Sequence, residues 1–252
     1  MDRPSGRLVG RKCHTLDCVL YGQLASPVAY VFIVIFLLLA GFFTFMLGGF
    51  FERNDASLVS FFMWLPWLYL FLVPAAGMRL WSEERRLGTI ELLLTMPITA
   101  WQAIVGKFLA SWLFLMLALA LTFPLWITVN YLGHPDNGVI VCGYVGSALM
   151  AGAYLAITSM TSAVTRNQVI AFILSVVICF LLVLAGWPPM TRLLDSLNLT
   201  GVRNLVASMS VMTHFVAFQR GVLDVRDLVF FVSLIGFALF TTGVVIRSHR
   251  AG

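Results

Sequence analysis

The chain has 252 residues, of which 60% are hydrophobic and only 11% are charged, whereas soluble domains usually carry about 25% charged residues. The apolar residues fall in long uninterrupted runs, which excludes a single soluble core and the short alternating strands of a membrane β-barrel. The net charge is +5, but the charged residues are too few and too scattered along the chain for a nucleic-acid-binding face, so no nucleic acid partner is expected.

Residues 1–26, ahead of the first apolar run, mix basic and polar residues with isolated apolar ones. We expect an amphipathic helix over residues 14–25 that lies at the membrane surface; a partly disordered tail is the alternative. Cys13, His14 and Cys18 offer only three metal ligands without a fourth, so no metal site is predicted here.

Six apolar stretches are each long enough to cross a bilayer, because about 20 helical residues span the hydrocarbon core. None of them contains Asp, Glu, Lys, Arg or His, which argues against an ion-coupled carrier and against an acid–base enzyme within the membrane. The predicted fold class is therefore an all-α membrane protein with six transmembrane helices. The predicted spans are Val28–Phe50, Ser57–Met78, Phe108–Asn130, Val139–Ala163, Gln168–Trp187 and Leu228–Ile246.

The basic residues divide unevenly between the two sides of these spans. With the N-terminus inside, eleven of the 16 Lys and Arg residues lie on the inner side and five on the outer side. Positive charge favours the cytoplasmic side of a membrane protein, so both termini are expected in the cytoplasm.

The segment Arg79–Lys107 joins the second and third spans and is the most charged part of the chain. Gly88 allows a turn, Thr89 can cap a short helix with Glu91 in its first turn, and Pro97 ends it. Apolar residues recur at helical spacing within this helix. The pattern favours a helix that docks into a groove of a soluble partner over an ordinary connecting loop.

The fourth span carries a stripe of small residues, Gly143, Ser147 and Ala151, at intervals of four. Small residues at this spacing let membrane helices approach each other closely. The stripe therefore predicts helix packing, either within the chain or between subunits.

The outer segment, residues 188–227, joins the fifth and sixth spans and has apolar residues at helical spacing. We expect one or two short amphipathic helices that rest on or dip into the outer leaflet. Asp224 and Asp227 are typical of a helix start ahead of the sixth span. His214 in this segment stands alone in the sequence, so no functional role is predicted for it.

The chain has no nucleophile beside a base and no Walker A pattern of Gly residues followed by Lys and Ser or Thr. No catalytic residue, cofactor site or metal site is predicted on it. If ATP drives the protein, another chain must bind and hydrolyse the ATP.

Residues Met78–Lys107, MRLWSEERRLGTIELLLTMPITAWQAIVGK, resemble the permease subunits of ABC-2 type transporters. They follow that family's pattern Glu-Arg-x-x-Gly-Thr-x-Glu-x-Leu-Leu, then Pro and Gly-Lys. The stretches Ser26–Phe43 and His214–Leu228 are similar to the branch that includes the gliding-motility ABC permease. The resemblance runs along nearly the whole chain.

The resemblance implies a single ABC-2 type transmembrane domain over residues 1–252, with an amphipathic elbow helix before six spans. It also implies a dimer with a second permease chain, identical or homologous, on two copies of an ABC ATPase that bind ATP and Mg. The segment 79–107 would hold the coupling helix that contacts the ATPase. The contact residues implied are Glu83, Glu84, Arg85, Arg86, Gly88, Thr89 and Glu91.

The function expected on this basis is that of the permease subunit of an exporter in the bacterial cytoplasmic membrane. The apolar spans predict a hydrophobic or amphipathic substrate, and membrane lipid and an accessory membrane or extracytoplasmic subunit are further partners to consider. The alternative is a membrane anchor that does not transport and passes mechanical work from the ATPase to a partner outside the cell.

Overall fold

The computed structural model describes residues 27–47, 57–88, 100–133, 135–187 and 208–248, together with residues 189–190, 192, 201 and 206. The helix expected over residues 14–25, Thr89, Glu91, Pro97 and most of the segment 188–207 lie outside the described residues. In the described part the chain is helical and has no strand. Its elements are α2 (Pro27–Phe42), the π-helix η1 (Phe43–Leu47), α3 (Val59–Gly77), α4 (Arg79–Leu87), α6 (Ala100–Ala120), α7 (Phe123–Leu132), α8 (Asn137–Val164), α9 (Gln168–Leu184), α12 (Val211–Gln219) and α13 (Val225–Ser248).

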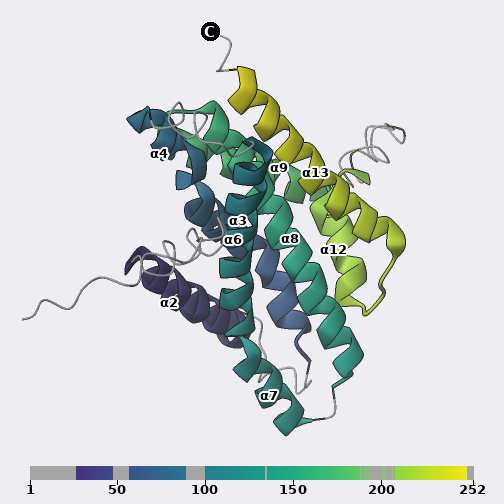
Figure 1. The fold of residues 1–252 in the computed structure, drawn as a ribbon. Coiled ribbons are helices and arrows are strands. Elements are labelled where there is room, and N and C mark those ends of the chain that lie inside the picture. The colour runs from purple at the N-terminus through teal and green to yellow at the C-terminus, as the bar shows by residue number, and fades with distance from the viewer. Residues whose placement is uncertain are drawn as a thin grey trace, which may run out of the picture.

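Helix α8 forms the centre of the bundle and contacts α3, α4, α6, α9, α12 and α13 (Figure 1). Its residues from Met150 to Ser159 are almost completely buried. Glycines on α8 let neighbouring helices come close: Gly146 lies against Phe218 of α12, and Gly152 lies against Trp112 of α6. Such contacts need small residues because membrane helices associate by close packing.

Five helical stretches are long and apolar enough to cross a membrane: Ala29–Leu47, Val59–Leu87, Trp101–Leu132, Asn137–Val164 and Val225–Ser248. They correspond to five of the six predicted spans, although their ends differ. The predicted span Gln168–Trp187 corresponds to α9, a shorter apolar helix of 17 residues. Large apolar side chains such as Leu38 on α2 and Phe237 on α13, each 67% exposed, cover the outside of the bundle. An apolar exterior suits contact with lipid chains, so the chain is a multi-pass membrane protein.

The predicted end of the second span at Met78 agrees with α3, which ends at Gly77, and the charged helix α4 follows directly at Arg79. Two features of the predicted third span are wrong. The third span begins earlier, since α6 starts at Ala100 and places Lys107 within the helix. It is also not one helix: the turn at Leu121–Thr122 separates α6 from α7, and the Thr122 hydroxyl donates to the carbonyl oxygen of Leu119 (2.6 Å).

Side chains that cap helix N-termini fix the starts of three helices. Asp136 accepts a hydrogen bond from Gly138 N–H at the start of α8, and Asn167 accepts one from Val169 N–H at the start of α9. Ser210 accepts hydrogen bonds from Met212 and Thr213 N–H at the start of α12. Each cap satisfies backbone donors that the first helical turn leaves unpaired.

The two ends of the bundle differ. Helix α4 and the C-terminal ends of α8 and α13 lie at one end, and α7 lies with the start of α8 at the other (Figure 1). Contacts agree with this arrangement: the Arg247 guanidinium of α13 lies 5.6 Å from the ring centre of Trp101 near the start of α6. At the opposite end Trp126 Nε1 of α7 donates to Asn137 Oδ1 of α8 (2.9 Å).

Candidate functional site

Four of the seven predicted ATPase-contact residues, Glu83, Glu84, Arg85 and Arg86, lie on α4, at the end of the bundle away from α7 (Figure 1). The charged stretch is therefore helical itself, where the sequence predicted a helix only from Thr89 onward. Arg85 and Arg86 lie in the last turn of α4, where positive charge is favoured by the helix dipole. Glu83 and Glu84 directly precede them on the same helix.

Gly88 ends α4. Its backbone has φ 70° and ψ 7°, the left-handed conformation, and its N–H donates to the Glu84 carbonyl oxygen. A residue with a side chain is strained in this conformation. Glycine is therefore needed for its backbone conformation, and not because a side chain would lack room. A side-chain carbon at Gly88 would meet nothing within 4 Å. Gly88 thus sets the direction in which the chain leaves α4 toward residues 89–99.

Hydrogen bonds to two serines of α8 hold the start of α4. Ser162 Oγ accepts from the backbone N–H groups of Trp81 (3.1 Å) and Ser82 (3.0 Å), and its hydroxyl donates to the Met78 carbonyl oxygen (2.9 Å). The Trp81 indole N–H donates to Ser159 Oγ (3.1 Å), and Trp81 is only 1% exposed. Buried hydrogen bonds of this kind contribute about 1 kcal/mol each. Together they attach α4 rigidly to the central helix.

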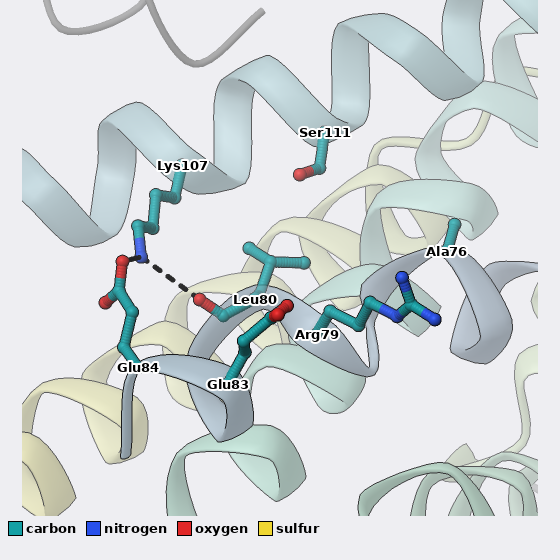
Figure 2. A pocket seen from close by; sticks show the side chains of 7 residues that line it. All are labelled: Ala76, Arg79, Leu80, Glu83, Glu84, Lys107 and Ser111. Atoms are coloured by element: carbon teal, nitrogen blue, oxygen red, sulfur yellow. Dashed lines mark hydrogen bonds and ion pairs between the residues drawn. The ribbon is translucent and has the colours of Figure 1, made fainter. Parts of the chain in front are cut away.

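A charged pair attaches α4 to α6 as well. The Lys107 ammonium forms an ion pair with Glu84 and donates to the Leu80 carbonyl oxygen (3.1 Å), as Figure 2 shows. It also lies 4.2 Å from the ring centre of Trp81. The side chains of Lys107 and Glu84 are 16% and 29% exposed, so water screens the pair only in part. Arg85 adds a third tie, a hydrogen bond to the Ala163 carbonyl oxygen at the end of α8.

A cavity of about 310 Å³ lies between α4 and α6, beside this ion pair (Figure 2). Both apolar and charged side chains line it, and the charged ones come from both helices. Its lining residues are Ala76, Arg79, Leu80, Glu83, Glu84, Lys107 and Ser111.

The sequence model of the ABC-2 family transporter proteins matches residues 70–246, well over half of the chain. The chain belongs to this family. None of the curated proteins matches it. Members of this family form the transmembrane permease of an ABC transporter and are not its ATPase. The partner of such permeases, as a class, is therefore an ABC ATPase. The matched region includes α4, Lys107 and the α8 serines.

The three small residues predicted to pack helices are all buried in this ABC-2 protein. A side-chain carbon at Gly143 would come 2.5 Å from Phe62 Cε2 of α3, so the two helices are in close contact there. Ser147 donates to the Gly143 carbonyl oxygen (2.7 Å), and Ala151 is 0% exposed. The stripe thus lies inside the subunit, where Gly143 faces α3.

Sequence reasoning missed the α8 serines that hold α4. The run Thr158 to Ser162 is a polar patch in an otherwise apolar helix, and this was a usable signal. Hydroxyl side chains in a membrane helix often hydrogen-bond across to a neighbouring helix. Nothing in the sequence, however, shows that the partner is α4, about 80 positions earlier in the chain.

His214 is not isolated, contrary to the prediction. Its Nδ1 lies within hydrogen-bond distance of Asp227 Oδ1 (2.5 Å) near the start of α13, and its Nε2 faces the Ser208 carbonyl oxygen (3.0 Å). Its ring also stacks on Phe230, with centres 4.1 Å apart. Because both side chains are at most 10% exposed, this pair fastens α12 to α13 away from solvent.

Proposed function

We propose that this permease couples ATP hydrolysis on a separate ABC ATPase to the export of a hydrophobic or amphipathic substrate. The observation that carries the proposal is the attachment of α4 to both α6 and α8, just ahead of residues 89–99. In this proposal Glu83, Glu84, Arg85, Arg86, Gly88, Thr89 and Glu91 contact the ATPase. ATP and Mg are bound by the ATPase, and none by this chain.

Force on α4 would reach the spans through the contacts described above. Ser162 and Ser159 connect α4 to α8, and Glu84 connects it to Lys107 of α6. Several hydrogen bonds at about 1 kcal/mol each would have to break before α4 moved alone. The spans would then shift with α4 as rigid bodies, as in other domain-closure transitions.

The topology proposed has six spans, with α9 as the fifth in chain order and both termini in the cytoplasm. Seventeen helical residues reach about 26 Å, close to the thickness of the hydrocarbon core. The excess of basic residues at the α4 end of the bundle supports this orientation. We place the protein in the bacterial cytoplasmic membrane, as a dimer with an identical or homologous permease chain on two ATPase subunits. Membership of the gliding-motility branch and an accessory subunit remain predictions.

The proposal is tested by purifying the affinity-tagged chain from native membranes and identifying the proteins that accompany it. We expect a protein with a Walker A motif, and ATP hydrolysis by the complex that a particular lipid or solute stimulates in proteoliposomes. The substrate is then the stimulating compound that moves to the opposite side of the vesicle. Stimulated hydrolysis without movement of any compound would favour the non-transporting anchor, and absence of an ATPase from the complex would refute both.

The role of α4 is tested in the same preparation with Glu84→Ala and Gly88→Trp, each compared with the wild type. We expect the ATPase to be lost from the complex, or its hydrolysis to stop responding to the stimulating compound. Gly236→Ala is the control, because Gly236 lies within α13 and an added side-chain carbon there meets nothing within 4 Å. Unchanged assembly and unchanged stimulation in both α4 variants would show that α4 is not the coupling contact.

A further inference from the structure

The cavity between α4 and α6 lies where apolar helix surface gives way to charged surface. On one side the apolar helix α3 ends at Gly77 and the charged helix α4 begins at Arg79. On the other side Lys107 precedes the apolar part of α6, and Ser111 follows one turn later. In a membrane protein this change marks the level of the lipid headgroups. The cavity therefore faces the region where headgroups lie and not the hydrocarbon core.

Two of the four charged side chains in the cavity, Lys107 and Glu84, are paired with each other. Lys107 also donates to the Leu80 carbonyl oxygen, so neither Lys107 nor Glu84 is a free charge for a ligand. Arg79 and Glu83 differ from them, because neither has an ion pair or side-chain hydrogen bond with any residue that the structure describes. Figure 2 shows their charged groups at separate positions along the same wall. With respect to the residues that the structure describes, the cavity thus offers the Arg79 cation and the Glu83 anion to a ligand.

The spacing of these two charges fits a ligand that carries both signs. Arg79 and Glu83 are four residues apart on α4, on the same face of the helix, where such neighbours have β-carbons about 5–6 Å apart. A guanidinium suits phosphate because its planar fork donates two parallel hydrogen bonds. A carboxylate suits a primary ammonium, which donates hydrogen bonds that a quaternary choline cannot. The four cavity charges sum to zero, so a ligand of net charge would remain uncompensated.

We propose that this cavity binds the headgroup of a zwitterionic aminophospholipid, with the phosphate on Arg79 and the ammonium on Glu83. The acyl chains would lie along the apolar walls at Ala76 and Leu80 toward the membrane. The proposed lipid site depends on the membrane location that the family shows, and it does not depend on the coupling role proposed for α4. Assignment to the cytoplasmic leaflet does rest on the proposed orientation.

The test is native mass spectrometry of the purified wild-type complex after exchange into detergent with phosphatidylethanolamine, phosphatidylglycerol or phosphatidylcholine. We expect phosphatidylethanolamine to be retained about tenfold better than the other two, the effect of one well-placed charged hydrogen bond. Arg79→Gln should lower retention of every phospholipid severalfold. Glu83→Gln should abolish only the preference for ethanolamine over glycerol. The matched control is Arg226→Gln, an exposed arginine at the start of α13 that does not line the cavity.

Three further measurements separate the possible outcomes. Soluble glycerophosphoethanolamine supplies the same headgroup without acyl chains; if it binds as tightly as the lipid, the site takes a soluble phosphate ester and the lipid proposal is wrong. Equal retention of the three lipids by the wild type, or unchanged retention in both cavity variants, would also overturn it. A melting curve shows that each variant is folded. ATPase association is measured on the same samples, and Arg79→Gln, which lies outside the proposed ATPase contacts, separates the lipid site from the proposed function.

Discussion

Ser162 of α8 accepts the backbone N–H of Trp81 in α4 at 3.1 Å, although the two residues are 81 positions apart in the sequence. The same oxygen accepts Ser82 N–H and donates to the Met78 carbonyl oxygen. One hydroxyl thus connects the central helix α8 to the charged helix α4 through three hydrogen bonds. Both residues are almost completely buried, so water does not compete for these bonds.

Ser162→Ala should therefore destabilise the protein by about 1–3 kcal/mol, because it removes the hydroxyl that three backbone groups of the Met78–Ser82 segment contact. Thermal unfolding in detergent measures the loss. Stimulation of the partner ATPase by substrate should also fall, since α4 would move more independently of α8. Ser233→Ala is the control: Ser233 is exposed on α13, and its hydroxyl donates to the Phe230 carbonyl oxygen of the same helix. Equal melting temperatures for the two variants would contradict the assignment.

Gly88→Ala should cost about 1 kcal/mol of stability, since alanine is strained at a φ of 70°. The larger effect should be on partner binding, because a changed turn redirects residues 89–99. Co-purification of the ATPase measures this effect. Gly236→Ala has a helical backbone and open space around it, so it should be neutral or slightly stabilising. If Gly88→Ala bound the ATPase as the wild type does, the turn would not be needed for coupling.

Lys107 and Glu84 should show measurable coupling in a double-mutant cycle. Lys107→Met alone leaves the partly buried Glu84 carboxylate without its partner, and Glu84→Gln alone leaves the Lys107 ammonium without its partner. The double variant removes both charges. We expect an interaction energy of about 1 kcal/mol from unfolding measurements in detergent. Strict additivity of the two single changes would mean that the pair contributes nothing to the attachment of α4.

Asp227→Asn should destabilise the protein by about 1–3 kcal/mol, because it alters one partner of a buried side-chain hydrogen bond. His214→Gln should have an effect of similar size, and the double variant should cost less than the sum of the two. The control is Asp224→Asn, since Asp224 is exposed and caps α13 through Arg226 N–H, a role that asparagine also fills. Unfolding in detergent measures all four variants, and near-additive effects would argue against a direct His214–Asp227 interaction.

The local sequence determined the helices of this protein and several of their ends. An apolar run of about 20 residues satisfies its own backbone hydrogen bonds and prefers lipid whatever else surrounds it. The spans were therefore predictable, apart from the length of α9 and the break after α6. Helix caps are equally local, which is why a turn at Gly88 and a helix start beside Asp224 could be expected from neighbouring residues alone.

Only the tertiary structure decided which of these helices meet. Ser162 with Trp81, Lys107 with Glu84 and His214 with Asp227 are separated by 81, 23 and 13 residues, and no local pattern pairs them. Polar side chains that leave water or enter a membrane must find partners, and packing around α8 decides which partners are in reach. The charged stretch after the second span was visible from the sequence, but its attachment to α6 and α8 depends on how the whole bundle packs.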